Sequence, residues 1–136
     1  MRFMLLVRST GESEAGVVPG KDVFAAMAKY NDDLAKAGVL LAVEGLHPSS
    51  KGSRVKFSGT KRTVVDGPFT ETKELIAGFW LIEVKSREEA IEWVKRCPAP
   101  FDGEAEIEVR QVFGMDDYAE QIPPDPSTPS GNAQQH

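Results

Sequence analysis

The sequence predicts an α+β fold with ferredoxin-like order, in which a β-α-β unit, a hairpin and a second β-α-β unit follow one another. Two stretches with helical periodicity each lie between two strand-like stretches, so both helices are expected on one face of the sheet. The strand-like stretches are apolar on both sides, which is typical of a sheet covered on both faces. Because the helices cover one face only, the simplest second layer is another copy of the chain in a two-fold dimer, sheet against sheet.

The first half begins with a strand over residues 2–8 that is apolar on both sides. One side carries Phe3, Leu5 and Val7, and the other carries Met4 and Leu6. Residues 9–20 are expected to form a polar loop. A helix over residues 22–37 follows, because apolar side chains recur there at three- and four-residue steps, and Gly38 ends it. Residues 39–46 read as a second, almost continuously apolar strand, which predicts burial on both faces.

A hairpin is predicted in the middle of the chain. Residues 54–58 alternate between apolar and basic side chains, residues 58–60 turn the chain, and residues 61–65 return. Val55 and Phe57 share one side of the first hairpin strand, and the basic side chains on the opposite side are expected to be solvated.

The second half begins with a strand over residues 77–85. One side of it carries Phe79 and Leu81, and the other carries Trp80, Ile82 and Val84. Ser86 and Glu89 have the spacing of a capping box, so a helix begins there, and it ends before Pro98.

The last predicted strand spans residues 104–113 and turns Glu106, Glu108 and Arg110 to one side. The following residues contain little apolar material. The chain is therefore divided into a domain over residues 1–118 and a polar, proline-containing tail over residues 119–136.

The bulk composition excludes several classes of function. The chain has 136 residues and a net charge of −5, which fits one soluble domain and argues against direct binding of nucleic acid. Cys97 is the single cysteine, so no internal disulfide forms, and it is expected to be a small buried residue at a helix end. The apolar start of the chain is too short to cross a membrane, and a cytoplasmic location is expected.

Residues 66–74 combine turn-forming, aromatic and charged residues between two strand patterns. Asp66 is expected to accept a hydrogen bond from a backbone N–H two or three residues further on, and Pro68 fixes the turn. Phe69 then projects from a rigid corner. Two interpretations stay open: the segment is the rim of a pocket, or it is a strand-to-loop corner followed by solvated charges.

These stretches resemble the DGPF group of the YCII-related family. The resemblance rests on Asp66-Gly67-Pro68-Phe69 and the Thr70–Glu74 segment after it, and it covers about residues 1–118. Further matching stretches are Tyr30-Asn31 through Gly38, Glu44-Gly45-Leu46, Pro48-Ser49-Ser50, Gly78-Phe79-Trp80, and Ala90 through Cys97-Pro98.

The resemblance implies a dimeric α+β barrel in a bacterial cytoplasm. It brings no secure activity, but it implies an association with extracytoplasmic-function sigma factors and hence a regulatory or ligand-sensing role. Better-described members of the family use a His in the first helix and an Asp before a Pro. Met27 and Cys97 occupy those positions here, so this acid–base pair is absent.

The sequence offers two sets of candidate site residues. Glu106, Glu108 and Arg110 are expected beside Asp66 and His47 in a cleft between two subunits. Tyr30, Phe69 and Trp80 are expected either to line an apolar pocket or to pack in the core. The candidate catalytic residues are Asp66, Glu71 and Glu106. The candidate ligand-binding residues are Tyr30, His47, Phe69, Lys73, Trp80 and Arg110. For Glu106, Glu108 and Arg110, the alternative is a solvated strand face with ordinary cross-strand pairing. The spacing of His, Cys and acidic residues favours no metal site, and no cofactor is expected.

Three functions therefore remain open, of which the third is a purely structural or adaptor role for the exposed loop and the tail. The first is a dimeric module that binds a small molecule and is linked to transcription regulation. The second is a cofactor-free lyase, isomerase or hydrolase that moves a proton in the inter-subunit cleft, with Asp66 or Glu71 as base and Arg110 or Lys73 holding an anionic substrate.

Overall fold

The computed structural model describes residues 1–101 and 103–121. The helices and strands are β1 (Arg2–Arg8), α1 (Gly11–Glu14), α2 (Lys21–Lys36), β2 (Leu40–Gly45), β3 (Ser53–Ser58), β4 (Lys61–Asp66), β5 (Ile76–Glu83), α3 (Arg87–Lys95) and β6 (Ile107–Gln111). Short 3₁₀ helices span Ser49–Lys51, Thr72–Glu74 and Met115–Tyr118. Residues 122–136, which make up most of the predicted tail, lie outside the described residues.

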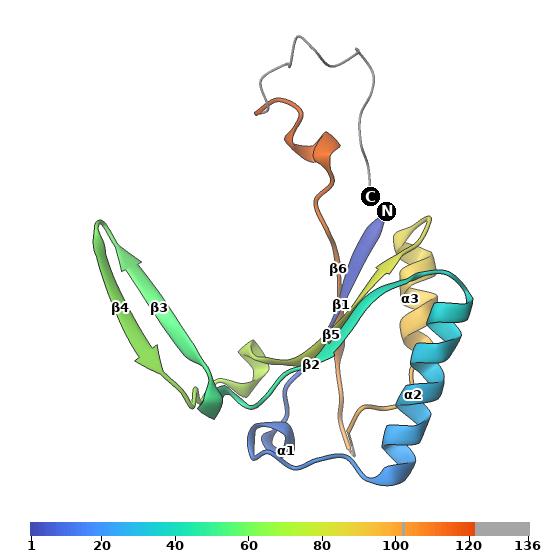
Figure 1. The fold of residues 1–136 in the computed structure, drawn as a ribbon, viewed down its shortest axis with the longest axis horizontal. Helices are drawn as coiled ribbons and strands as arrows, with labels where there is room; N and C mark the ends of the chain where they lie inside the picture. The colour runs from blue at the N-terminus through green and yellow to red at the C-terminus, as the bar shows by residue number, and fades with distance from the viewer. Residues whose placement is uncertain (102, 122–136) are drawn as a thin grey trace.

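Four strands form one antiparallel sheet with the order β2-β5-β1-β6. Figure 1 shows α2 and α3 together on one side of this sheet. This is the ferredoxin-like arrangement that the order of elements predicted. The β3–β4 hairpin is a separate two-stranded sheet inserted between the two halves.

The hydrophobic core lies between the sheet and the two helices. The buried apolar residues are Phe3, Leu5, Val7, Tyr30, Leu34, Trp80, Ile82, Val84, Ala90 and Trp93. Their positions confirm the predicted alternation along β1 and β5, because every second residue of each strand is buried. Ala90 and Trp93 are the buried residues of α3 and anchor this helix in the core.

The opposite face of the sheet carries a second set of apolar side chains. Met4 pairs with Leu81, and Leu6 pairs with Phe79, so these four residues are neighbours at the centre of that face. All four are only half-buried. No helix or strand of the described residues packs on this face, which we call the open face.

Both long helices end as the sequence indicated. Gly38 has φ +76° directly after α2, in the left-handed conformation that glycine favours. At the start of α3, the N–H of Glu89 donates to the Ser86 hydroxyl at 3.1 Å. The return bond of the capping box comes instead from the N–H of Lys85, which donates to the Glu89 carboxylate at 3.5 Å.

Three local predictions were wrong. Residues 9–20 are not a plain loop, because Thr10 caps the short helix α1 by accepting from Ser13 N–H at 3.2 Å. Strand β2 is not buried throughout, since it is an edge strand in which Leu41 lies at a register shift and is exposed. The predicted strand over residues 104–113 shortens to β6, and Phe113 turns outward to stack on Tyr118 at 5.0 Å.

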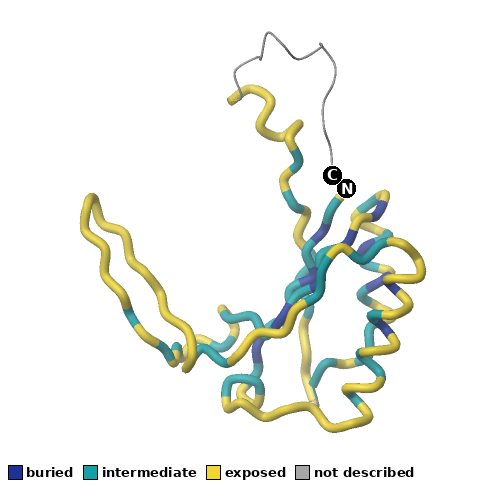
Figure 2. The backbone as a smooth tube through the Cα atoms, viewed as in Figure 1, coloured by how far each residue is buried: buried dark blue, intermediate teal, exposed yellow. Residues whose placement is uncertain are grey.

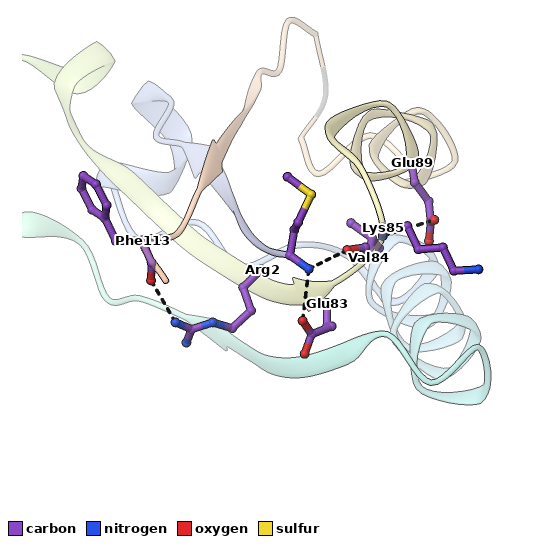
Figure 3. Close-up of polar contacts among 7 residues, drawn as sticks. Arg2, Glu83, Val84, Lys85, Glu89 and Phe113 are labelled. Carbon is purple, nitrogen blue, oxygen red and sulfur yellow. Dashed lines mark hydrogen bonds and ion pairs between the residues drawn. The ribbon is translucent and has the colours of Figure 1, made fainter. Parts of the chain in front are cut away.

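Polar contacts close the end of the sheet near the chain start (Figure 3). The amine of Met1 donates to the carbonyl of Val84 at 2.9 Å and lies 3.3 Å from the Glu83 carboxylate. The Arg2 guanidinium donates to the carbonyl of Phe113 at 3.1 Å. These bonds join β1 to the residues that follow β5 and β6.

Candidate functional site

A cavity of about 540 Å³ opens between α2, the segment before it, and the β2–β5 side of the sheet. Its size suits a small organic molecule of one or two rings. The lining residues are Val7, Ser13, Gly16–Pro19, Val23, Phe24, Met27, Asn31, Val43–Pro48, Ala77–Trp80, Pro100 and Phe101. Glu44 and His47 are the ionisable residues among them, so the walls are mostly apolar.

The mouth of the cavity is apolar as well. Val18 and Phe24 line it while keeping 79% and 70% of their surfaces exposed, and Val17 and Leu46 are also exposed. Exposed apolar side chains gathered around a concave opening are typical of a site that takes an apolar ligand.

The inner wall is fixed by a polar contact. The indole Nε1–H of Trp80 donates to the side-chain oxygen of Asn31 at 2.7 Å. Trp80 also meets Tyr30 edge to face, with ring centroids 5.5 Å apart. Because its oxygen already accepts from Trp80, Asn31 keeps its amide N–H groups as hydrogen-bond donors next to the cavity.

Tyr30 lies behind this wall rather than on it. Its hydroxyl donates to the carbonyl of Trp93 at 2.6 Å in the core. Burial raises the pKa of Tyr30 strongly, Cys97 adds to the rise, and Arg96 opposes it. The phenol therefore stays protonated and serves as a structural donor between α2 and α3.

The 66–69 segment is a corner, as the second interpretation of the motif proposed. The Gly67 N–H donates to the carbonyl of Gly52 at 2.9 Å, and the Phe69 N–H donates to the Ser49 hydroxyl at 3.0 Å. Ser49 is held in turn by the carboxylate of Glu14, to which it donates both its N–H and its hydroxyl. The corner thus joins α1, the 49–52 turn and the hairpin.

Asp66 does not make the predicted bond within the turn. Pro68 has no N–H, and the N–H of Phe69 is used by Ser49. The Asp66 carboxylate instead accepts from the Ser53 hydroxyl at 2.7 Å, across the base of the hairpin. The Phe69 ring is covered by the Arg54 guanidinium, which lies 3.8 Å from the ring centroid.

The structure separates the predicted site residues into different places. His47 and Trp80 line the cavity, and Tyr30 lies directly behind Trp80. Asp66 and Phe69 belong to the corner. The other predicted site residues, which are all exposed, are Glu71, Lys73, Glu106 and Arg110. Within residues 1–101 and 103–121, no hydrogen bond or ion pair joins Asp66 or Glu71 to Glu106 or Arg110. Their proposed catalytic and binding roles stay predictions.

Charged residues of β1 and β6 form a small network on the open face. Glu108 pairs with Arg8 at 3.4 Å and with Arg110 at 3.1 Å. Arg8 also donates to the backbone carbonyl of Lys73. Because Arg8 and Glu108 are partly shielded from solvent, this network holds the 72–74 turn at the end of β1.

The described part of the chain holds neither a cluster of metal ligands nor a membrane-spanning helix. No group of three or more His, Cys, Asp or Glu side chains there is arranged to hold a metal ion. No helix there is long and apolar enough to cross a membrane.

Cys97 is partly buried at the end of α3, and burial raises the pKa of its thiol to about 11. The thiolate is the reactive form, so at about pH 8 iodoacetamide is expected to alkylate the folded chain on the order of 100-fold more slowly than free cysteine. Mass spectrometry of the native and the urea-unfolded protein measures this difference. Equal rates for the two would contradict it.

Several cavity residues were missed at the level of the sequence, among them Met27, Asn31 and Val43. One available signal was the apolar run Val17-Val18-Pro19 in an otherwise polar stretch. Another was Gly78, where a Cβ would lie 2.7 Å from the carbonyl oxygen of Glu44, so that β2 and β5 approach closely beside the cavity.

The chain was compared with protein families, curated proteins and solved structures, and it is similar to the following. A sequence model of the YCII-related domain matches residues 1–115. A curated relative, an uncharacterised protein of Rhizobium meliloti (strain 1021), is 33% identical over 92 residues, which span 68% of this chain and 71% of the relative. A solved structure, 5-chloro-2-hydroxyhydroquinone dehydrochlorinase of Burkholderia phenoliruptrix AC1100 in complex with 2,5-dihydroxybenzoquinone, is 17% identical. It covers 85% of this chain and 98% of its own, with a TM-score of 0.44.

Proposed function

Because the chain belongs to the YCII-related domain family, as the resemblance of its motifs predicted, we propose that it is a small-molecule-binding protein of this family. The ligand is a small, neutral, largely apolar molecule with one or two rings, and it binds in the cavity between α2 and the sheet. The single observation that supports this proposal is the apolar cavity itself, with the Trp80–Asn31 pair on its inner wall.

The lining favours a neutral ligand over an anionic one. Among the described lining residues there is no Lys or Arg, whereas Glu44 is one of them, so a ligand carboxylate placed inside would meet no ammonium or guanidinium group. Asn31 offers donors for one carbonyl or hydroxyl oxygen, while Met27, Val43 and Ala77 offer apolar contact. The ligand is thus oriented by one polar group and held mainly by burial of its rings.

A small panel of probes tests the proposal. Phenol and 2-naphthol are expected to raise the melting temperature and to change the fluorescence of Trp80, with 2-naphthol the tighter ligand because it buries more apolar area. Benzoate is the matched charged probe and is expected to bind more weakly than either. Absence of saturable binding by the neutral probes at millimolar concentration would overturn the proposal.

The second part of the proposal is that the protein acts as a homodimer. The apolar centre of the open face, formed by Met4, Leu6, Phe79 and Leu81, faces solvent in the single chain. Exposure of these residues costs free energy that a second sheet would recover. A two-fold dimer with the open faces in contact is therefore proposed.

Light scattering at micromolar concentration is expected to give the mass of two chains. Leu81→Glu places a charge at the centre of the proposed contact and is expected to give a folded monomer, because a buried unpaired carboxylate is costly. Glu83→Gln, on the same strand but at its end, is the control and is expected to stay dimeric. A wild-type protein that is monomeric at this concentration would overturn the proposed dimer.

Two finer predictions from the sequence are kept as proposals. Proton transfer by Asp66, Glu71 or Glu106 requires the second subunit to complete a cleft. Replacing Asp66 with Asn separates the two roles, since a purely structural Asp66 would lower the melting temperature without changing ligand binding. The association with a sigma factor rests on the family resemblance. It is tested first by whether a sigma-factor gene lies beside this gene, and then by co-purification of the two proteins.

A further inference from the structure

The β3–β4 hairpin, which we call the arm, projects from the body of the molecule. Among the described residues, its two strands pair only with each other, and every residue of it except Val65 is exposed. Figure 2 shows the arm as an almost continuously exposed ribbon that stands apart from the sheet and helices. An isolated two-stranded hairpin is only marginally stable in water, so an arm of this length is expected to pack against another protein surface.

One side of the arm is apolar. Val55 lies directly opposite Val64, and Phe57 follows on the same side. These side chains are 50%, 64% and 71% exposed, respectively. The Arg62 guanidinium covers part of the Phe57 ring at 4.3 Å, and the remaining apolar surface faces solvent. Such a strip on a projecting element is typical of a contact surface for another protein.

The base of the arm is held in a fixed direction. The corner bonds from Gly67 to Gly52 and from Phe69 to Ser49 hold its two ends together. Ser49 donates in turn to the Glu14 carboxylate of α1, which joins the corner to the body. In Figure 1 the sheet lies between the two helices and the arm, so the arm extends on the side of the open face. A second chain seated on the open face would lie beside the arm.

Charge also favours a second copy of this chain as the occupant. The arm contains four basic residues and one acidic residue, so it carries +3, and because the whole chain carries −5 the rest of the chain carries −8. A basic arm and an acidic body attract each other between two identical molecules, and the two-fold axis repeats the contact.

We propose that each arm packs its Val55–Phe57–Val64 side against the body of a second copy of this chain, namely the copy that covers the open face. The inference rests on the dimer put forward above. The dimer interface then has two parts, the contact between the two sheets and the contact of each arm with the other subunit. Burial of the arm's apolar strip stabilises the dimer, and the arm's basic residues orient the two subunits through their attraction to the acidic body.

The test removes the apolar side chains of the arm while keeping its two strands intact. The triple variant Val55→Thr, Phe57→Ser, Val64→Thr keeps residues suited to a hairpin, and Thr63→Ser on the other side of the arm is the matched control. Sedimentation velocity over a dilution series is expected to show the dimer dissociation constant raised by at least about tenfold in the triple variant and unchanged in the control. Both variants should keep the wild-type binding of 2-naphthol.

Hydrogen exchange gives a second readout. In the wild-type dimer, the amides of residues 53–66 are expected to exchange more slowly than in the protein diluted to monomers. If the wild type is dimeric while the triple variant dimerises equally well, the arm proposal is overturned and the dimer stands. If the wild type is monomeric, both are overturned, and the ligand proposal is judged separately by the probe titration. Double-stranded DNA that binds the arm without any effect of the triple variant on dimerisation would also overturn it.

Discussion

Gly67→Ala is expected to lower the free energy of unfolding by about 3 kcal/mol, because the corner of the molecule leaves no room for a side chain there. A Cβ at this position would overlap the carbonyl oxygen of Ser49 and lie 2.7 Å from its carbonyl carbon. Both are backbone atoms, so the 49–52 turn has to move away. That movement breaks the bonds of Gly67 to Gly52 and of Phe69 to Ser49.

Chemical denaturation followed by circular dichroism measures the effect. Gly11→Ala is the matched control, since a Cβ there meets nothing within 4 Å, and its stability is expected to change by less than about 1 kcal/mol. If the Gly67 variant were as stable as the wild type, the corner would accommodate a Cβ without loss of its hydrogen bonds. That result would contradict the close packing described for Gly67.

Met27→Trp is expected to weaken the binding of 2-naphthol by about tenfold or more. Met27 projects from α2 into the cavity, so the larger ring takes space that the ligand needs. Loss of about 60 Å² of apolar contact corresponds to about 1.5 kcal/mol, which is about a tenfold change in affinity. Fluorescence titration measures the dissociation constant.

Ala28→Trp is the control for this variant. It adds the same side chain to the same helix at an exposed position outside the cavity. Its affinity for 2-naphthol is expected to equal that of the wild type. Equal affinities for the wild type and the Met27 variant would mean that the probe binds elsewhere.

The order of strands and helices could be predicted because each element carries its own pattern. Alternation along β1 and β5 identifies the two faces of the sheet, and Gly38 and Ser86 mark helix ends. The edge position of β2 could not be predicted in the same way. Its apolar residues are typical of a central strand, and only the pairing order places them at an edge.

The cavity could not be predicted because it depends on segments far apart in the sequence. Val18, Met27, Val43 and Trp80 come together only when α2 packs on the sheet, and none of them has a spacing that indicates a site. The sequence predicted a site in the charged 66–74 segment instead, because charged and aromatic residues in a turn are typical of ligand-binding and catalytic sites. In the structure, Gly67 and Phe69 are used to build the corner.

The two tryptophans provide the most direct test of ligand binding in the cavity. The indole N–H of Trp80 lies at the inner wall, where it donates to Asn31, whereas Trp93 is buried elsewhere under Arg96. In a ¹⁵N-correlated NMR titration with 2-naphthol, the Trp80 indole signal is expected to shift in a saturable way while the Trp93 signal stays in place. A stationary Trp80 signal at saturating probe, or a shift confined to Trp93, would contradict the proposed site.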